Sequence, residues 1–292
     1  MNIIAIFHAY KFTHFSSDAK VKLKTDKLTA AQKTGILLFG VSNPRPANSN
    51  KPEQPFETVM LQSNKQLECW YVKAKNAKGT VLLFHGYQGN KSVLIEQSNI
   101  FHELGYHTLL VDFMGSGGSE GNQTTIGYKE AEEVKTCFDY IAAKGEKNIY
   151  LCGNSMGAVA IMKAITNYDI APKAIMIGCP FGSMYKTVGA RFDIMGTPKF
   201  PMAGLLMFWG GTINGYWAFG HNPVDYAKAI KCPVLLAYGA KDNRVSMAEI
   251  KSIYTNLAGQ KTLKVYPEGG HDFLDDCKDK WAKHIADFLK MK

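Results

Sequence analysis

The feature that most constrains the fold is an alternation between two kinds of segment. Short runs of consecutive apolar residues recur at 81–84, 108–111, 149–152, 174–177 and 234–238. Uninterrupted apolar runs of this length are typical of strands buried on both faces. Helix-length segments lie between them, and their apolar residues recur at three and four positions, as at Ala131, Val134, Phe138 and Ile141. The alternation predicts an α/β fold, with a mostly parallel central sheet, right-handed crossovers and helices on both faces.

Two further features modify this plan. Residues 58–61 and 67–72 favour a pair of antiparallel strands at the start of the sheet. The stretch from Pro180 to Pro223 separates two predicted strands and is far longer than a crossover needs, and it is rich in large apolar side chains. We therefore expect an N-terminal extension at residues 1–56 and a core domain at 57–292, with an inserted cap at about 180–223.

The N-terminus allows two interpretations. Ile3–Ala9 is apolar but much shorter than the roughly 20 residues of a membrane-spanning helix. The aromatic and partly basic stretch Phe7–Phe15 resembles the border of a membrane anchor, so membrane association through the N-terminus stays open beside an ordinary docked terminus. Further on, Thr29 and Gln32 have the spacing of a capping box and predict a short helix at 29–39. The expected location is the cytoplasm, or a membrane surface if an anchor exists.

The composition argues against two classes of partner. The formal net charge of +9 could suggest nucleic acid, but the lysines are scattered and no nucleic-acid recognition motif is present. The six cysteines form no CxxC pair and no His/Cys cluster at zinc-ligand spacing, so we expect free thiols in a reducing compartment and no metal site.

The strongest local motif is Gly153-Asn-Ser-Met-Gly157, which fits the G-x-S-x-G nucleophile elbow. It directly follows the apolar run 149–152 and precedes a helix-like segment. A serine at such a strand-to-helix turn has a strained backbone, and side chains two positions before and after it would collide with neighbouring elements. Ser155 is therefore the predicted nucleophile.

Two backbone N–H groups are candidates for an oxyanion hole. The Met156 N–H lies at the predicted start of a helix, where the dipole favours negative charge. The second donor is expected in His85-Gly-Tyr-Gln-Gly89, which follows the strand at 81–84. We assign it to the Tyr87 N–H, with Gln88 as the alternative, and expect a structural role for His85.

An acid and a base follow the serine in the order Ser, Asp, His that this motif predicts. Asp242 comes just after the strand at 234–238, and His271 follows a predicted strand at 263–266 in a glycine-flanked loop. Carboxyl ends of parallel strands meet at one edge of a sheet, so the three side chains should converge. Asp272 and Glu268 are less suitable acids, because their positions are typical of charged, solvent-exposed loop residues.

The stretch Asp112–Gly121 contains several glycines but is not a dinucleotide-binding loop. Glu120 stands where the third glycine of G-x-G-x-x-G is required. We expect this turn to close one edge of the mouth of the active site, and no cofactor is predicted.

With these motifs in place, the chain resembles the α/β-hydrolase superfamily, in particular its esterase, lipase and serine-aminopeptidase-like branch. The resemblance extends from about Glu57 to Lys290, and its motifs lie at His85, Asp112, Ser155, Asp242 and His271. It implies an acyl-enzyme mechanism without metal or organic cofactor. Met114 departs from the pattern, because many relatives carry arginine there, so we expect a structural ion pair to be loosened. Membrane-anchored relatives are common in this branch.

The predicted function is hydrolysis of an ester or thioester in a small-molecule substrate with a short or medium apolar acyl chain. The cap residues Phe192, Phe208, Trp209 and Trp217 are candidates for substrate contacts, although such side chains could equally pack the cap on the core. The same triad would support a peptidase or an acyltransferase. Ser155 argues against relatives that use an aspartate nucleophile, and the complete triad argues against a non-catalytic scaffold. The sequence does not indicate an oligomeric state.

Overall fold

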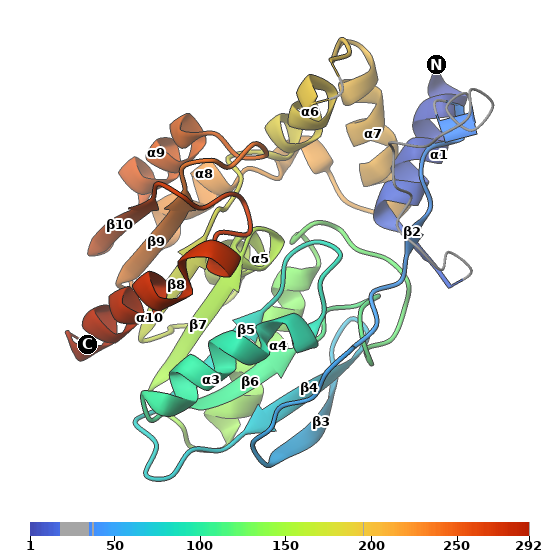
Figure 1. Ribbon diagram of the computed structural model, residues 1–292. Coiled ribbons are helices and arrows are strands. Elements are labelled where there is room, and N and C mark those ends of the chain that lie inside the picture. Colours follow the sequence, from blue (N-terminus) through green and yellow to red (C-terminus); the bar gives the residue numbers. More distant parts are fainter. Residues whose placement is uncertain (18–34, 37, 195, 292) are drawn as a thin grey trace.

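The apolar runs of the sequence form the strands of one mixed sheet in the computed structural model, which describes residues 1–17, 35, 36, 38–194 and 196–291. In this part of the chain the main sheet has eight strands in the order β10-β9-β8-β7-β5-β6-β4-β3 (Figure 1). The strands are β3 (Phe56–Gln62), β4 (Gln66–Val72), β5 (Thr80–Phe84), β6 (His107–Val111), β7 (Ile149–Asn154), β8 (Ala174–Gly178), β9 (Val234–Gly239) and β10 (Lys261–Tyr266). Strands β5 to β10 pair in parallel, whereas β4 is antiparallel to both β3 and β6.

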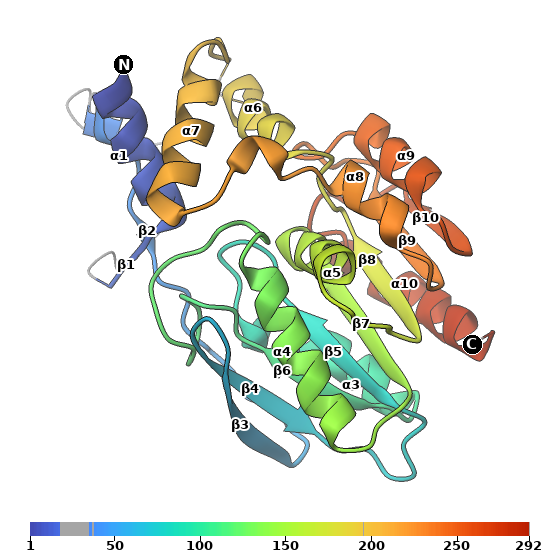
Figure 2. The same ribbon diagram turned by 180° about the vertical axis from the view of Figure 1, so that it is seen from behind.

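Helices cover both faces of this sheet. One face carries α3 (Ile95–Glu103) and α10 (Leu274–Lys290), and the opposite face carries α4 (Glu130–Ala143) and α5 (Met156–Asn167) (Figures 1 and 2). Every residue of β5, β8 and β9 is buried, as strands between two helical layers require. Two further helices, α8 (Pro223–Tyr226) and α9 (Met247–Asn256), flank β9 and β10. The predicted α/β class with a mostly parallel sheet is confirmed.

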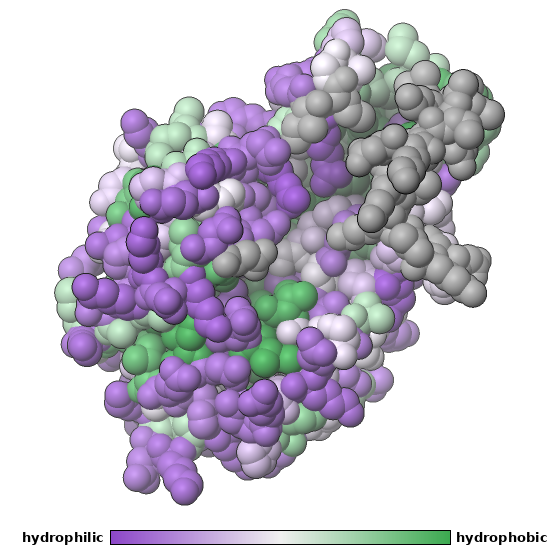
Figure 3. Space-filling model, in the orientation of Figure 1, coloured by the Kyte–Doolittle hydropathy of each residue, from purple (hydrophilic) through white to green (hydrophobic). Residues whose placement is uncertain are grey.

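The inserted segment forms a helical layer beyond the sheet. It contains α6 (Met184–Ile194), α7 (Met202–Asn214) and the short 3-10 helix η3 (Ala218–Gly220). Figures 1 and 2 show α6 and α7 at the end of the molecule toward which β7 and β8 point. The surface is indented where this layer meets the body that holds the sheet (Figure 3).

The N-terminal helix α1 (Asn2–Thr13) packs against α7 rather than against the sheet. Its small residues Ala5 and Ala9 are buried, and Trp209 Nε1 donates a hydrogen bond to Asn2 Oδ1 at 3.1 Å. Ile3 and Phe7 remain 71% and 42% exposed. None of the helices in the described ranges combines the length and the apolar character needed to cross a bilayer.

The rest of the predicted extension runs back to the core. The two-residue strands β1 (Phe15–Ser16) and β2 (Asn43–Pro44) pair in parallel, and Arg45 Nη1 then donates to the Gly117 carbonyl at 2.7 Å. The helix predicted at 29–39 lies largely outside the described residues, and its described positions 35, 36, 38 and 39 are helical. The division at residues 56 and 57 stays a prediction, with β3 beginning at Phe56.

Candidate active site

Ser155 lies at the tight turn between β7 and α5, with a backbone conformation that few residues adopt. Its φ is 52° and its ψ is −115°, outside the regions that a side chain ordinarily favours. A Cβ at Gly153 would lie 2.8 Å from the Gly157 carbonyl carbon, and one at Gly157 would lie 2.3 Å from the Phe84 oxygen. Both positions therefore have room only for glycine, as the elbow motif requires.

The side chains of Ser155, His271 and Asp242 form one hydrogen-bonded chain. The Ser155 hydroxyl donates to His271 Nε2 at 2.9 Å, and His271 Nδ1–H donates to Asp242 Oδ2 at 2.7 Å. We assign the tautomer from these two contacts, because a carboxylate can only accept. The three residues come from the ends of β7, β9 and β10, where parallel strands bring their following loops together.

Asp242 is held in its ionised form by its surroundings. Burial of its side chain raises the pKa, but the hydrogen bond from His271, the electrostatic effect of that histidine and two backbone N–H groups together lower it by more. The other carboxylate oxygen, Oδ1, accepts the backbone N–H groups of Arg244 at 2.7 Å and Val245 at 3.0 Å. The net result is an Asp242 pKa below its ordinary value, which suits an acid that must stay charged to orient an imidazole.

The loop 85–89 lies directly beside Ser155. A Cβ at Gly86 would be 3.6 Å from the Ser155 Cβ, so this backbone approaches Ser155 closely. In the described part of the chain, the backbone N–H of Tyr87 donates to no protein acceptor, and Met156 opens α5, where the first N–H has no partner within the helix. Both groups are free to bind a ligand, and their role as oxyanion donors stays a prediction.

His85 fastens this loop to its neighbour. Its Nε2 accepts the Phe113 N–H at 3.1 Å, and its Nδ1–H donates to the Gly86 carbonyl at 2.8 Å. The ring is buried, and this burial lowers its pKa. Both ring nitrogens are thus occupied in positioning backbone, which agrees with the structural role expected from the sequence.

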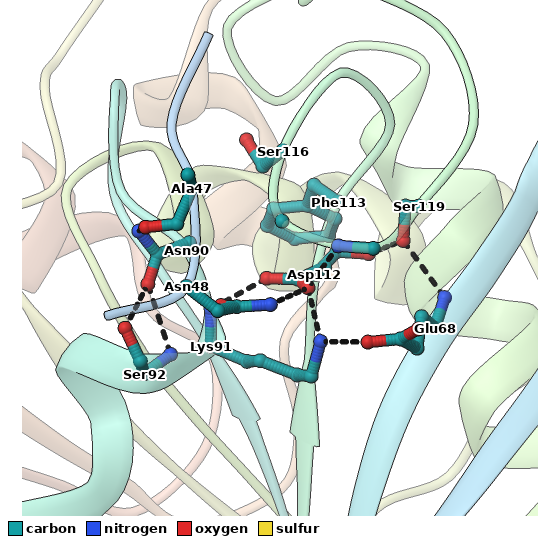
Figure 4. Close-up of polar contacts among 12 residues, drawn as sticks. Ala47, Asn48, Glu68, Asn90, Lys91, Ser92, Asp112, Phe113, Ser116 and Ser119 are labelled. Atoms are coloured by element: carbon teal, nitrogen blue, oxygen red, sulfur yellow. Dashed lines mark hydrogen bonds and ion pairs between the residues drawn. The ribbon is translucent and has the colours of Figure 1, made fainter. Parts of the chain in front are cut away.

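Asp112 forms a strong ion pair, contrary to the loosened pair expected from Met114. The Lys91 Nζ binds Asp112 Oδ2 and also Glu68 Oε1, the latter at 2.6 Å (Figure 4). Lys91 is fully buried, and its ammonium lies 4.4 Å from the centre of the Trp70 ring. The positive charge is supplied by Lys91 in the 3-10 helix η2 (Lys91–Leu94), which follows the loop 85–89, and not by a residue at position 114.

The remaining lone pairs of Asp112 are also satisfied. Its Oδ1 accepts the Lys91 N–H at 2.6 Å, and its Oδ2 accepts Asn48 Nδ2 at 2.9 Å and the Gly118 N–H at 2.8 Å (Figure 4). Burial alone would raise the pKa of Asp112, but the charge of Lys91, with smaller effects of His85 and of the hydrogen bonds from Lys91 and Asn48, lowers it overall. The sequence analysis did not identify Lys91. The signal that could have pointed to it was Asp112 itself: without an arginine at position 114, a buried carboxylate needs a cation from another part of the chain.

Glu133 on α4 binds the backbone of the glycine-rich loop Asp112–Gly121. Its Oε2 accepts the Met114 N–H at 3.0 Å, whereas its Oε1 has no hydrogen-bond partner among the described residues. Burial raises the pKa of Glu133 well above its ordinary value, and the negative charge of Glu130 raises it further. The folded protein therefore keeps a proton on this carboxyl group that the unfolded chain would lose.

This proton predicts a pH-dependent stability. The native state binds the extra proton above the unfolded-state pKa, so the free energy of unfolding should fall as pH rises from the unfolded-state pKa toward the higher folded-state pKa. Glu133→Gln mimics the protonated form. The free energy of unfolding of this variant should no longer fall with pH on account of residue 133, so the variant should become more stable than the wild type as pH rises. Urea unfolding at several pH values measures it. The exposed neighbour Glu132→Gln is the control and should leave the slope unchanged; equal slopes for wild type and Glu133→Gln would refute the prediction.

The four cap residues proposed as substrate contacts lie in different surroundings. Phe192 is buried on α6, whereas Phe208 and Trp217 are 45% and 63% exposed. Phe208 packs edge to face with Trp209, and Trp217 lies 5.0 Å from Phe219 between ring centres. Their role in substrate binding stays a prediction.

Cys179, together with Asp242 and His271 of the hydrogen-bonded chain, has the donor set of a metal site. Ligand atoms of Cys179, Asp242 and His271 all lie within 4.8 Å of one another. However, burial raises the pKa of the Cys179 thiol, with the charge of Asp242 adding to the effect, and a protonated thiol is a poor metal ligand. The chemistry of this group therefore favours an acid–base pair over a metal centre.

Comparisons with known proteins agree with this fold. A family model described as serine aminopeptidase, S33, matches residues 75–201 and 211–278. The esterase PF2001 of Pyrococcus furiosus has a similar structure, with a TM-score of 0.71 at 22% identity, covering 85% of this chain and 96% of that one.

Curated relatives are distant in sequence. The uncharacterized protein YqkD of Bacillus subtilis is 23% identical over 76% of this chain and 75% of its own length. The lysophosphatidylserine lipase ABHD12 of Xenopus tropicalis is 23% identical over 69% of this chain. The match spans only about half of ABHD12 (53%), so the activity of that whole protein does not transfer directly.

Proposed function

The chain belongs to the serine aminopeptidase S33 family of α/β-hydrolases, and from this premise we propose that it is a serine hydrolase that cleaves carboxylic esters through an acyl-enzyme intermediate. The observation that carries the proposal is the hydrogen-bonded chain from Ser155 through His271 to Asp242, with contacts of 2.9 and 2.7 Å.

In the proposed first step, Ser155 Oγ attacks the ester carbonyl carbon while its proton passes to His271 Nε2. The imidazolium that forms is stabilised by the ionised Asp242 beside Nδ1. The negative oxygen of the tetrahedral intermediate is bound by the N–H groups of Tyr87 and Met156, each of which contributes about 3 kcal/mol in comparable sites.

Collapse of this intermediate expels the alcohol, which takes the proton from His271 Nε2, and leaves an acyl group on Ser155. Water then enters, gives its proton to Nε2 and attacks the acyl carbonyl. The second tetrahedral intermediate releases the acid and returns the proton to Ser155 Oγ. Every proton is carried by His271, so no metal or organic cofactor is needed for either half-reaction.

An ester with an apolar acyl chain is the substrate class we favour. The inserted layer carries Phe192, Met184 and Val188 as buried apolar side chains on α6, and the name of the relative ABHD12 states a lipase activity. The family description favours an aminopeptidase as the second candidate. An acyltransferase would use the same residues and differ only in that an acceptor other than water takes the acyl group from Ser155.

The proposal is tested by covalent labelling together with a substrate panel. A fluorophosphonate should label the wild type at Ser155 and leave Ser155→Ala unlabelled, as read by mass spectrometry of the peptide that contains this residue. Ser183→Ala, at a half-buried serine before α6, is the matched control and should label like the wild type.

The panel compares p-nitrophenyl esters from acetate to octanoate with aminoacyl anilides. Esters should be hydrolysed much faster than anilides. Turnover of anilides alone would replace the esterase by the peptidase, and labelling of both serine variants to equal extents would reject Ser155 as the nucleophile.

A further inference from the structure

A positively charged side chain of the inserted layer lies beside the loop 85–89, which we call the oxyanion loop. Arg191, near the end of α6, places its guanidinium carbon 3.9 Å from the centre of the Phe12 ring and 5.4 Å from that of Tyr87. The two rings stack on each other with centres 5.0 Å apart, and the Tyr87 hydroxyl donates to the Phe12 carbonyl at 2.7 Å. Tyr87 follows Gly86, whose backbone approaches Ser155. The guanidinium therefore lies against the side chain of a loop residue whose neighbour approaches Ser155.

The charge of Arg191 has no counter-ion in the described part of the chain. The nearest acid along α6, Asp193, pairs with Lys199 at 2.6 Å instead. Desolvation lowers the pKa of Arg191; Tyr87 opposes this in part, and the positive charge of Arg244 lowers the pKa by a smaller amount. A guanidinium that lies over aromatic rings and pairs with no carboxylate among the described residues keeps its five N–H donors available for an anion from outside.

A second arginine, Arg244, lies close in sequence to the predicted catalytic acid. It lies in the loop after β9, where its backbone N–H binds Asp242 Oδ1. Its side chain is exposed, and its guanidinium reaches Asp272 only at 3.9 Å, a contact too long for a hydrogen bond. One arginine thus comes from the inserted layer beside the oxyanion loop, and the other comes from the loop of the catalytic acid.

We propose that Arg191, assisted by Arg244, binds an anionic phosphate or carboxylate group carried by the ester substrate. This inference rests on the proposed function and narrows its substrate class from apolar esters to esters that combine an apolar chain with an anionic group. Guanidinium groups suit this task because they bind both oxyanions through paired N–H donors. The anion also relieves the repulsion between the two arginines.

Matched substrate pairs test the inference on the full chain. The alcohol-side pair is 1-octanoylglycerol 3-phosphate and 1-octanoylglycerol; the acyl-side pair is octyl hydrogen succinate and octyl butyrate. For each pair the measured quantity is the ratio of kcat/KM for the anionic ester to that for the neutral ester. In at least one pair Arg191→Met should lower the ratio about tenfold or more, since a hydrogen bond to a charged group contributes at least that factor.

The variants separate charge from packing. Methionine keeps an apolar side chain over the Phe12 ring, and Arg191→Lys should retain part of the preference because it keeps a positive charge. Lys186→Met removes an exposed charge one turn earlier on α6 and should leave both ratios at the wild-type value. Unchanged ratios in Arg191→Met for both pairs would overturn the inference while leaving the esterase intact.

A binding measurement keeps the inference independent of turnover. Calorimetric titration with octyl phosphate should give a Kd at least about tenfold weaker for Arg191→Met than for the wild type. Inorganic phosphate, titrated in parallel, should bind far more weakly, because it lacks the apolar chain; equal affinity would indicate a site for free phosphate instead. If the wild type cleaves no ester but binds octyl phosphate through Arg191, the proposed function fails and the anion site stands. If octyl phosphate binds both proteins equally, the anion site fails.

Discussion

Replacing Asp242 by asparagine should lower kcat for ester hydrolysis by about 10⁴-fold, because the imidazole then loses the partner that fixes its tautomer. In the wild type Asp242 Oδ2 accepts the His271 Nδ1–H at 2.7 Å. An amide nitrogen facing Nδ1 would favour the tautomer whose Nε2 carries the proton, and this nitrogen could no longer accept the proton of Ser155. The measurement is steady-state hydrolysis of p-nitrophenyl butyrate, with thermal unfolding to verify the fold.

The adjacent acid provides the control. Asp272 follows His271 directly and is 64% exposed in its side chain, so Asp272→Asn changes the same charge beside the same histidine. It should alter kcat by less than about tenfold, as expected for an exposed charge. A large loss in Asp272→Asn together with a small loss in Asp242→Asn would transfer the role of the orienting acid to Asp272.

Replacing Lys91 by methionine should destabilise the fold by about 3–5 kcal/mol, because it leaves the buried carboxylate of Asp112 without its cation. Both side chains of this ion pair are fully buried. Asp112 has a lowered pKa in the wild type, so its contribution to stability is complete above the unfolded-state pKa and is lost as pH falls through the folded-state pKa. The destabilisation should therefore be larger at pH 8 than at pH 4, as measured by urea unfolding.

An exposed ion pair offers the comparison. Lys135 pairs with Asp139 one turn along α4, with side chains 39% and 51% exposed. Lys135→Met should cost no more than about 1 kcal/mol. If Lys91→Met costs as little, then the network around Asp112 does not depend on its cation, and the role assigned to Lys91 is wrong.

The parts of the fold that follow from local pattern could be predicted from the sequence. Buried parallel strands require apolar residues at every position, so β5, β7, β8 and β9 are visible as uninterrupted runs. The elbow is equally local, since Gly153 and Gly157 are required by backbone contacts shorter than 3 Å that any side chain would make. Because the fold brings the carboxyl ends of its strands to one edge, the order of Ser155, Asp242 and His271 was enough to predict their convergence.

The contacts that escaped prediction join residues far apart in the chain without a shared pattern. Lys91 lies in η2, which follows the loop 85–89, whereas Asp112 follows β6. No spacing rule in the sequence links these two positions. The packing of α1 on α7 depends on small residues such as Ala9 and Gly210, whose surfaces fit each other only in three dimensions. Arg191 could not be distinguished from other exposed arginines before its aromatic partners were known.

The position of α1 connects the first turns of the chain to the loop beside Ser155. One side of α1 is buried on α7, and its last turn accepts the Tyr87 hydroxyl through the Phe12 carbonyl. Lifting α7 away from the sheet must either drag α1 along, pulling on the loop beside Ser155, or expose Ala5 and Ala9 to water. Any displacement of α7 would therefore be coupled, through α1, to the loop that carries Tyr87.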